Sequence, residues 1–240
     1  MNSYQKKFKD EINELVLAAI RLGELGYVTS HGGNLSYRVE QKVFLITPTK
    51  VVKRKMQFDD IVIIDDHGDV LFESPGRMPT GETPMHLALY RFRPDLNALV
   101  HAHPPVLTGF SMVDQDLLTR PLLPEPVLEV GPVLTVPYAE PVSDELAAQF
   151  EKYASQSNAW LMQNHGITLG SSEGIERAVD LLEMTEAMAV SASVAFRLGK
   201  VGSISIEEVM NMERTLSSRN MPRPGDPRTI KKLTDLFYKE

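Results

Sequence analysis

Two histidines separated by one residue are the first feature of the sequence that could do chemistry. His101 and His103 end an apolar run that begins at Ala98, and Pro104 follows them directly. Residues two apart on an extended strand point to the same face, so both imidazoles can reach one ion. One core histidine beside one surface histidine would show the same spacing, and the pair alone does not distinguish these two interpretations.

A third histidine favours the metal interpretation. His165 occupies a turn between two predicted strands, and Gly166 after it permits a close approach of ligand or backbone. Three histidines around one ion leave a coordination position open for water or substrate, as catalytic sites require. We therefore predict a divalent metal that acts as a Lewis acid. Imidazole donors favour Zn2+, with Mn2+ or Co2+ as alternatives.

The other ionisable residues are less informative. Glu82 stands at a predicted helix entrance, where a carboxylate either interacts with the helix dipole or points into a site, and the local sequence favours the dipole. His86 lies inside that helix, a position typical of a buried hydrogen-bonding residue, and neither it nor His31 is assigned to the metal. His67 lies in a turn rich in aspartate, and we expect it to be solvated.

The spacing of apolar residues predicts the elements that must position these side chains. Apolar positions from Phe8 to Leu22 recur every three or four residues and predict a helix that ends at Gly23. Apolar runs rich in β-branched residues predict strands over 43–47, 61–64, 70–72, 97–103, 159–162 and 167–169. Further helices are predicted from Thr83 to Arg93, from about Ser143, from about Ser172 to Gly199, from Ser205, and up to 236–238.

Two segments are predicted to be irregular. The glycines and small polar residues of 29–36 predict a binding loop with uncovered N–H groups. The three prolines and one glycine of 217–228 predict a mobile loop. The order of elements predicts one α+β or three-layer α/β/α domain, with the catalytic part over 1–202 and a helical C-terminal extension over 203–240.

Composition excludes several classes of function. The 240 residues contain 25 Lys and Arg against 32 Asp and Glu, a formal net charge of −7, which disfavours binding to nucleic acid. The absence of cysteine excludes disulfides, thiolate metal sites and a cysteine nucleophile. Charges recur through 1–16 and no stretch approaches the length of a membrane span, so we expect no signal peptide, no membrane partner and a cytoplasmic protein.

Taken together, the motifs resemble the class II aldolase/adducin family, in particular its L-fuculose-phosphate aldolases and L-ribulose-phosphate 4-epimerases. The similarity spans about residues 8–200 and is carried by Gly33-Asn34-Leu35-Ser36, Ile46-Thr47-Pro48-Thr49, Glu82 with Met85-His86 and Tyr90, Arg93-Pro94-Asp95, Val100-His101-Ala102-His103-Pro104 and Asn164-His165-Gly166. It implies a three-layer α/β/α fold whose central, mainly antiparallel sheet is flanked by helices. It also implies a homotetramer with active sites shared between subunits.

The resemblance further implies roles for individual residues. His101, His103 and His165 would bind zinc, with Glu82 as a fourth ligand that is released to act as acid or base when substrate arrives. The substrate phosphate would be held by Gly33, Asn34, Thr47, Thr49, Lys50, Thr80 and Gly81.

This chain departs from the family pattern at three positions. Gly81 lacks the hydroxyl that many members have there, and Lys50 replaces a glycine, so that it either crowds the pocket or adds a cation for a phosphate or carboxylate. The tyrosine proton donor of fuculose-phosphate aldolase aligns loosely with a segment of this chain that offers Glu125 instead. A solvated loop carboxylate is the alternative interpretation of Glu125.

These groups support chemistry through an enediolate. A metal stabilises the negative charge that develops on a polarised ketose, and a carboxylate moves the proton. The first hypothesis is a zinc-dependent aldolase that cleaves a small ketose phosphate. A decarboxylase of a 3-oxo-acid phosphate, favoured by Lys50 and the missing tyrosine, and a sugar-phosphate epimerase are alternatives on the same site. The expected partner is thus a small phosphorylated sugar or sugar acid.

Two hypotheses belong to other classes. A non-catalytic scaffold domain, as in adducin, would not need the intact set of three histidines and Glu82. An aldolase that forms a Schiff base needs a desolvated lysine, for which Lys50 is the candidate, and would leave the histidines idle. The apolar end of the C-terminal extension predicts that it covers a neighbouring subunit's site, with Tyr238 reaching the substrate.

Overall fold

An eight-stranded sheet forms the centre of the molecule. The computed structural model describes residues 2–238, and within them the strands pair in the order β4-β3-β2-β1-β5-β8-β7-β6. Their bounds are β1 Asn34–Glu40, β2 Val43–Ile46, β3 Val62–Asp65, β4 Val70–Phe72, β5 Ala98–Ala102, β6 Val133–Val136, β7 Ala159–Met162 and β8 Gly166–Ser171. All neighbours are antiparallel except β6 and β7, which are parallel. The mainly antiparallel sheet is therefore confirmed.

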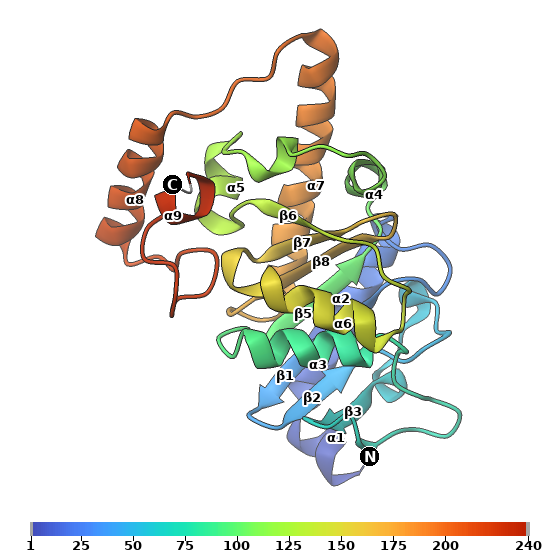
Figure 1. Ribbon diagram of the computed structural model, residues 1–240. Helices are drawn as coiled ribbons and strands as arrows, with labels where there is room; N and C mark the ends of the chain where they lie inside the picture. Colours follow the sequence, from blue (N-terminus) through green and yellow to red (C-terminus); the bar gives the residue numbers. More distant parts are fainter. Residues whose placement is uncertain (1, 239–240) are drawn as a thin grey trace.

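Helices cover both faces of this sheet. They are α1 Ser3–Lys7, α2 Lys9–Glu24, α3 Thr83–Phe92, α4 Pro105–Ser111, α5 Pro124–Glu129, α6 Asp144–Gln149, α7 Ile175–Leu198, α8 Ile206–Arg219 and α9 Thr234–Phe237. One core cluster joins the sheet to α2, α4 and α7, and a second joins the opposite face to α3 and α6, which lie in front of the sheet in Figure 1. The fold is the three-layer α/β/α arrangement.

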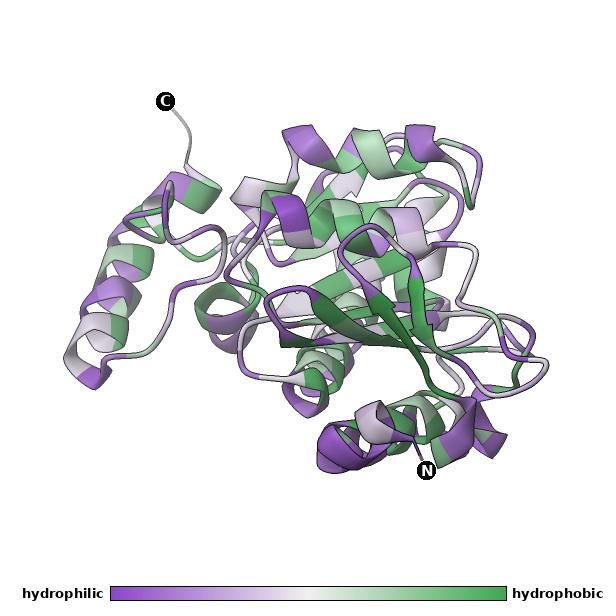
Figure 2. Ribbon diagram, turned by 90° about the horizontal axis from the view of Figure 1, so that it is seen from below, coloured by the Kyte–Doolittle hydropathy of each residue, from purple (hydrophilic) through white to green (hydrophobic). Residues whose placement is uncertain are grey.

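Strand alternation decides which face each side chain takes. In β5, Ala98 and Val100 belong to the core on the α7 side, whereas Leu99 belongs to the core on the α3 side. His101 is two residues beyond Leu99 and therefore faces α3. Figure 2 shows mostly hydrophobic strands between helices of mixed character, as expected for a sheet buried on both faces. Within the described range, no helix combines the length and apolar content needed to cross a bilayer.

Several predicted boundaries differ from the structure. The binding loop ends at Gly33, because Asn34 already pairs with the end of β5 and so begins β1. α7 begins after Gly174, which is its N-cap, rather than near Ser172. The helices α1, α4 and α5 were not predicted, since five to seven residues are too few to show a helical period.

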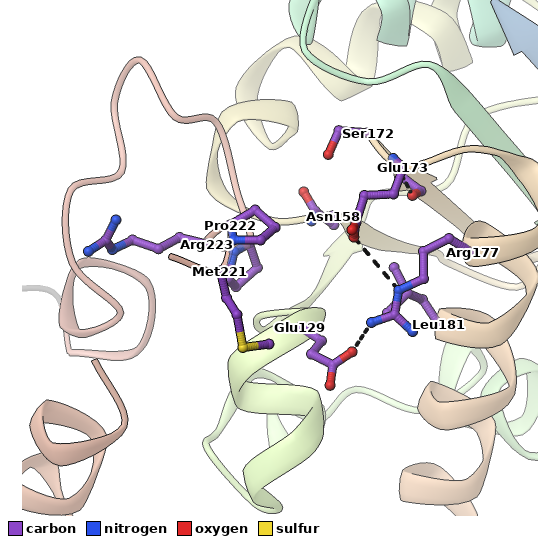
Figure 3. Close-up of a pocket in the computed structure, with 11 residues that line it drawn as sticks. Glu129, Asn158, Ser172, Glu173, Arg177, Leu181, Met221, Pro222 and Arg223 are labelled. Carbon is purple, nitrogen blue, oxygen red and sulfur yellow. Dashed lines mark hydrogen bonds and ion pairs between the residues drawn. The ribbon is translucent and has the colours of Figure 1, made fainter. Parts of the chain in front are cut away.

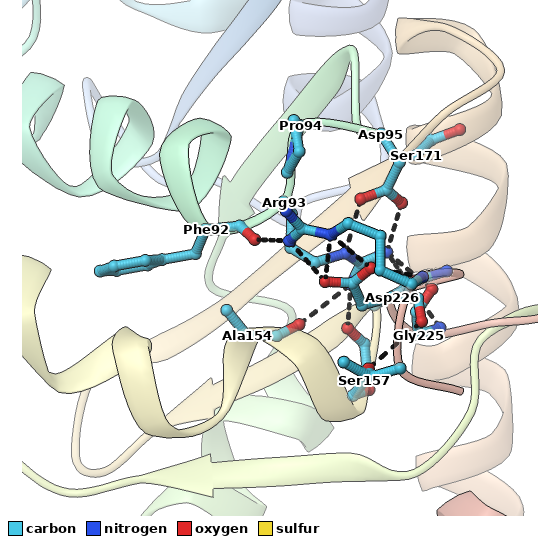
Figure 4. Close-up of polar contacts among 12 residues, drawn as sticks. Phe92, Arg93, Pro94, Asp95, Ala154, Ser157, Ser171, Gly225 and Asp226 are labelled. Atoms are coloured by element: carbon cyan, nitrogen blue, oxygen red, sulfur yellow. Dashed lines mark hydrogen bonds and ion pairs between the residues drawn. The ribbon is translucent and has the colours of Figure 1, made fainter. Parts of the chain in front are cut away.

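The segment predicted to be a mobile loop, 217–228, is packed at its centre: residues 224–226 are buried, whereas most of the others are exposed. α8 continues to Arg219, and only 1% of the surface of Asp226 is exposed. The cause is the buried guanidinium of Arg93, which Figure 4 shows between the end of α3 and the C-terminal segment. It donates to the backbone oxygens of Ala154, Ser157 and Gly225, to Asn158 Oδ1, and to both carboxylate oxygens of Asp95.

The C-terminal extension packs on its own chain. α8 and α9 form a small third core with residues of α5, including Val127, Leu216 and Leu236. The hydroxyl of Tyr238 donates to Ile204 O at 2.6 Å. The boundary at residue 202 stays a prediction, and residues 239 and 240 of the predicted extension lie outside the described part of the chain.

Replacing Arg93 by Ala should lower the free energy of unfolding by about 3 kcal/mol or more, because Asp95 loses its buried partner and several carbonyl oxygens lose their donor. Thermal or denaturant unfolding measures this loss. Arg214→Ala is the matched control, since Arg214 is exposed on α8 and should leave the Tm nearly unchanged. Equal losses in the two variants would show that Arg93 does not hold the C-terminal segment.

Candidate metal centre

Three neighbouring strands bring their ends together at one place in the sheet. β1 and β8 are both antiparallel to β5, so their starts lie beside its end. Asn34 pairs with His101, and Ile167 pairs with Ala102. This register sets His101 beside the start of β1 on one side and beside the turn that carries His165 on the other.

The three histidines predicted to bind metal converge at this place. The nitrogens of His101, His103 and His165 that can act as ligands all lie within 4.8 Å of one another. The Nε2 atoms of His101 and His103 are 3.0 Å apart. The arrangement can hold a metal ion.

Burial keeps these imidazoles neutral. It lowers the pKa of His103 to about 4, and the charges of His165 and Lys53 act in the same direction. Burial also lowers the pKa of His101, well below the ordinary value, and that of His165. A metal ligand must offer an unprotonated nitrogen, so the set is prepared for a cation at neutral pH.

Glu82 faces the histidines from the N-terminus of α3. It is the N-cap residue, yet its side chain makes no capping hydrogen bond, and only 7% of its surface is exposed. Its Oε2 lies 3.4 Å from His101 Nε2, and its Oε1 lies 3.7 Å from His165 Nε2. The local sequence favours a solvated carboxylate that interacts with the helix dipole. For Glu82, this interpretation is wrong.

One atom of Glu82 tests whether these residues fit a metal. Its Oε1 is buried and has no hydrogen-bond partner among the described residues. A buried carboxylate oxygen without a partner is costly, and an ion bound to the neighbouring imidazoles would supply one. Three imidazoles and one carboxylate also make a donor set that suits a tetrahedral Zn2+. The residues present thus fit the ion.

Neighbouring groups fix the direction of the rings. His101 Nδ1 lies 3.0 Å from Ile167 O, so that its N–H is used there and Nε2 is left for the site. A Cβ at Gly166 would lie 2.5 Å from His103 Cδ2 and 2.6 Å from Ala102 O. Only glycine allows this turn to approach the His103 ring so closely.

A buried hydrogen-bond chain holds Glu82. Asn34 Nδ2 donates to Glu82 Oε2 at 2.6 Å, and Asn34 Oδ1 lies 2.5 Å from His86 Nε2. Ser36 Oγ lies 2.7 Å from His86 Nδ1 and 2.9 Å from Tyr90 Oη. Because burial lowers the pKa of His86 to about 4, the neutral ring donates to Asn34 and accepts from Ser36. His86 is thus a buried hydrogen-bonding residue, as the sequence predicts.

The residues that the resemblance assigns to phosphate lie close together but differ in accessibility. An isolated bridge between Pro48 and Pro79 brings their two segments side by side. Thr49 is half-buried, and Lys50 and Gly81 are exposed. Gly33, Asn34, Thr47 and Thr80 are buried, and Thr47 Oγ1 accepts from Leu35 N while Thr80 Oγ1 accepts from Glu82 N.

Sequence reasoning missed one charged residue near the site. Lys53 is 1% exposed, and its Nζ donates to His31 O at 3.3 Å and to Val51 O at 3.2 Å. Burial lowers its pKa to about 8. It is thus the desolvated lysine that the Schiff-base hypothesis assigned to the exposed Lys50. The run of basic residues around it predicts solvent exposure and gives no signal of burial.

Glu125, the predicted second proton-transfer residue, comes from a different element than Glu82 and the histidines. It is exposed in the first turn of α5, a helix that packs against α7 and α8. Its assignment stays a prediction that rests on the resemblance.

A separate cleft of about 140 Å³ lies between α5, α7 and the C-terminal segment, as Figure 3 shows. No histidine lines it. Its cations have partners within the protein: Arg177 pairs with Glu129 and Glu173, and Arg223 pairs with Glu213. Among the described residues, the cleft therefore has no unpaired cation for a ligand, and it is a weaker candidate for a binding site than the histidine centre.

Comparison with known families agrees with the geometry. The model of the class II aldolase and adducin N-terminal domain matches residues 13–192. The chain belongs to this family. The resemblance inferred from the motifs is therefore confirmed. Class II aldolases depend on a metal, and the three histidines offer such an ion a site in this chain.

Relatives within the family carry two different activities. A 3-oxo-tetronate 4-phosphate decarboxylase from Haemophilus influenzae is 30% identical over 195 residues, covering 79% of this chain and 90% of the relative. An L-fuculose phosphate aldolase from Methanococcus maripaludis is 33% identical over 175 residues, covering 72% of this chain and 91% of the relative. A solved L-fuculose 1-phosphate aldolase aligns with a TM-score of 0.77 at 28% identity, covering 87% of this chain and 96% of its own.

Replacing His103 by Ala should reduce the bound divalent metal from about one ion per chain to well below that, because the change removes one of the three imidazole ligands from a site built around all of them. The fold should persist, since His103 lies beyond the end of β5 rather than in a core. Elemental analysis and circular dichroism measure the two effects. His67→Ala, in the exposed turn between β3 and β4, is the control and should keep its metal. Full metal content in both variants would refute the centre.

Proposed function

We propose that this protein is a metal-dependent lyase that removes carbon dioxide from a small phosphorylated 3-oxo sugar acid. The observation that carries the proposal is the pairing of one carboxylate, Glu82, with three neutral histidines, of which His101 is buried and the other two are half-buried. The relative from Haemophilus influenzae, named as a decarboxylase of this kind, supports the choice of reaction.

Decarboxylation beside a ketone needs an electron sink and one proton. The bond to the carboxyl carbon breaks, carbon dioxide leaves, and the electron pair enters the ketone to give an enediolate. An ion held by His101, His103 and His165, Zn2+ by the nature of the donors, supplies the Lewis acidity that stabilises this negative charge. Glu82 gives a proton to the carbon that lost carbon dioxide and regains one from water.

The buried polar chain prepares Glu82 for this role. The Asn34 amide donates to one carboxylate oxygen, and His86 fixes the orientation of that amide. The other oxygen has no hydrogen-bond partner among the described residues and is free to reach an ion or a proton. Thr49 and Lys50, at the accessible edge of the site, would bind the phosphate or carboxylate of the substrate.

The aldolase that the sequence predicts first is the second candidate. The likeness to a solved L-fuculose 1-phosphate aldolase favours it. Aldol cleavage needs an additional group to take the hydroxyl proton of the departing aldehyde. The predicted group, Glu125, is exposed in the first turn of α5, and its part in this reaction stays a prediction.

Metal-loaded protein should release carbon dioxide from a 3-oxo-acid phosphate faster than it releases aldehyde from any ketose phosphate of a panel. Glu82→Gln should keep most of the metal and slow turnover about a hundredfold or more, the scale of lost acid–base catalysis. Glu125→Gln is the matched control and should leave decarboxylation unchanged. Aldehyde release without carbon dioxide release would establish the aldolase instead. If the protein shows neither activity at full metal occupancy, that result would favour the non-catalytic hypothesis.

We also propose assembly as a homotetramer, which the resemblance implies. Phe196 and Leu198, at the end of α7, are 72% and 84% exposed, and a monomer gains little by showing such side chains to water. Light scattering of the intact metal-loaded protein should give the mass of four 26.8 kDa chains. A fully active monomer at micromolar concentration would contradict both the assembly and the prediction that Tyr238 reaches a neighbour's substrate.

A further inference from the structure

Val142, at the edge of the site, holds a backbone conformation that its side chain disfavours. It lies between β6 and α6 with a φ of +71°, in the left-handed region. β-branched residues rarely adopt this region, because the side chain crowds the following carbonyl. With 57% of its surface exposed, Val142 gains little from burial to offset the strain.

The surrounding structure enforces this conformation. Ser143 is the N-cap of α6, and both its N–H and its hydroxyl donate to Glu140 O, at 3.3 and 2.6 Å. At the other end of the connection, Tyr138 N donates to Gln163 Oε1 at 3.2 Å. The segment is thus fixed at one end by its own helix and at the other by the turn that carries His165.

The strained side chain lies against Gly81. A Cβ at position 81 would lie 2.7 Å from Val142 Cγ1 and 3.2 Å from its Cγ2, well inside the ordinary contact distance of carbon atoms. Gly81 is exposed and precedes Glu82 directly. The isopropyl group of Val142 therefore occupies the space into which any side chain at position 81 would project.

Two other residues with a left-handed φ belong to segments of the candidate site. Within 2–238, the non-glycine residues with a left-handed φ are Ser30, Lys50, Val142, Asn164 and Asn220. Asn164 precedes His165, and Lys50 belongs to the predicted phosphate set, whereas Asn220 is an ordinary helix C-cap. A protein retains backbone strain where function requires a particular geometry.

We propose that Val142 and Gly81 form a matched pair that selects the anionic end of the substrate. The proposal rests on the proposed function, a lyase for small phosphorylated sugar acids. By filling the space at position 81, Val142 makes this wall apolar and removes the hydroxyl donor that many family members have there. The phosphate then depends on Thr49 and on the charge of Lys50.

A double-variant cycle tests the pair by the affinity of the metal-loaded protein for inorganic phosphate, measured by calorimetry. Gly81→Ser alone should weaken binding, because its Cβ collides with Val142. Gly81→Ser combined with Val142→Gly should bind phosphate about tenfold more tightly than Val142→Gly alone, the effect of one added hydrogen bond to an anion. The same effect of Gly81→Ser in both backgrounds would overturn the proposal.

Thermal stability and enzyme kinetics together give a second readout. If Val142 had only a structural role, its replacement would change the Tm but not KM. Val142→Gly should raise the Tm by about 3 °C, because glycine relieves the left-handed strain. Val142→Ala keeps that strain and should not raise it. Both variants should raise KM for a phosphate monoester more than they lower kcat. Unchanged KM in both variants would overturn the pair.

These measurements separate the two proposals. Phosphate affinity and Tm require no turnover, so a non-additive cycle supports the pair even where no lyase activity is found, and the proposed function then fails alone. An additive cycle in an active decarboxylase overturns the pair and leaves the proposed function standing.

Discussion

Hydrogen bonding between the antiparallel strands β1, β5 and β8 determines where the candidate site lies. Because β5 runs opposite to both neighbours, its last residues meet their first ones, and residues far apart in sequence become adjacent. A shift of one residue in this register would turn His101 toward the α7 side and separate it from α3. The metal centre is therefore a property of the sheet as much as of the histidines, and the helix α3 adds Glu82 to a place that the strands already define.

The centre also shows how a protein can bury ionisable groups at moderate cost. The imidazoles are neutral, and the Glu82 carboxylate accepts a hydrogen bond from the Asn34 amide, which His86 and Ser36 hold in turn. Such a chain is rigid because each member has its partners among the described residues. Rigidity at one carboxylate oxygen and freedom at the other is the arrangement that an acid or base needs, since it must be held in place and still exchange a proton.

How much of this structure the sequence predicts depends on how far apart in the sequence the residues of each contact lie. The shared face of the two β5 histidines follows from alternation within one strand, and it is predicted correctly. The contact of Asn34 with Glu82 spans 48 positions and exists only after β1 pairs with β5, so the residue that orients the carboxylate could not be predicted from local patterns. Lys53 is a similar case: its burial depends on the packing of the 3-10 turn Lys53–Lys55 against α2, and nothing in its basic neighbourhood indicates this.

The buried arginine at the end of α3 has a consequence for the order in which the chain can mature. During synthesis, Arg93 emerges well before its acceptors at Ser157 and Gly225. Until the ribosome has released the segment around residue 225, the guanidinium lacks one of its six acceptors in the described part of the chain, Gly225 O, while the acceptors at Asp95, Ala154, Ser157 and Asn158 are already within the chain. The docking of the C-terminal segment on Arg93 can therefore form only when translation is nearly finished, after the sheet and the helices on its faces have left the ribosome.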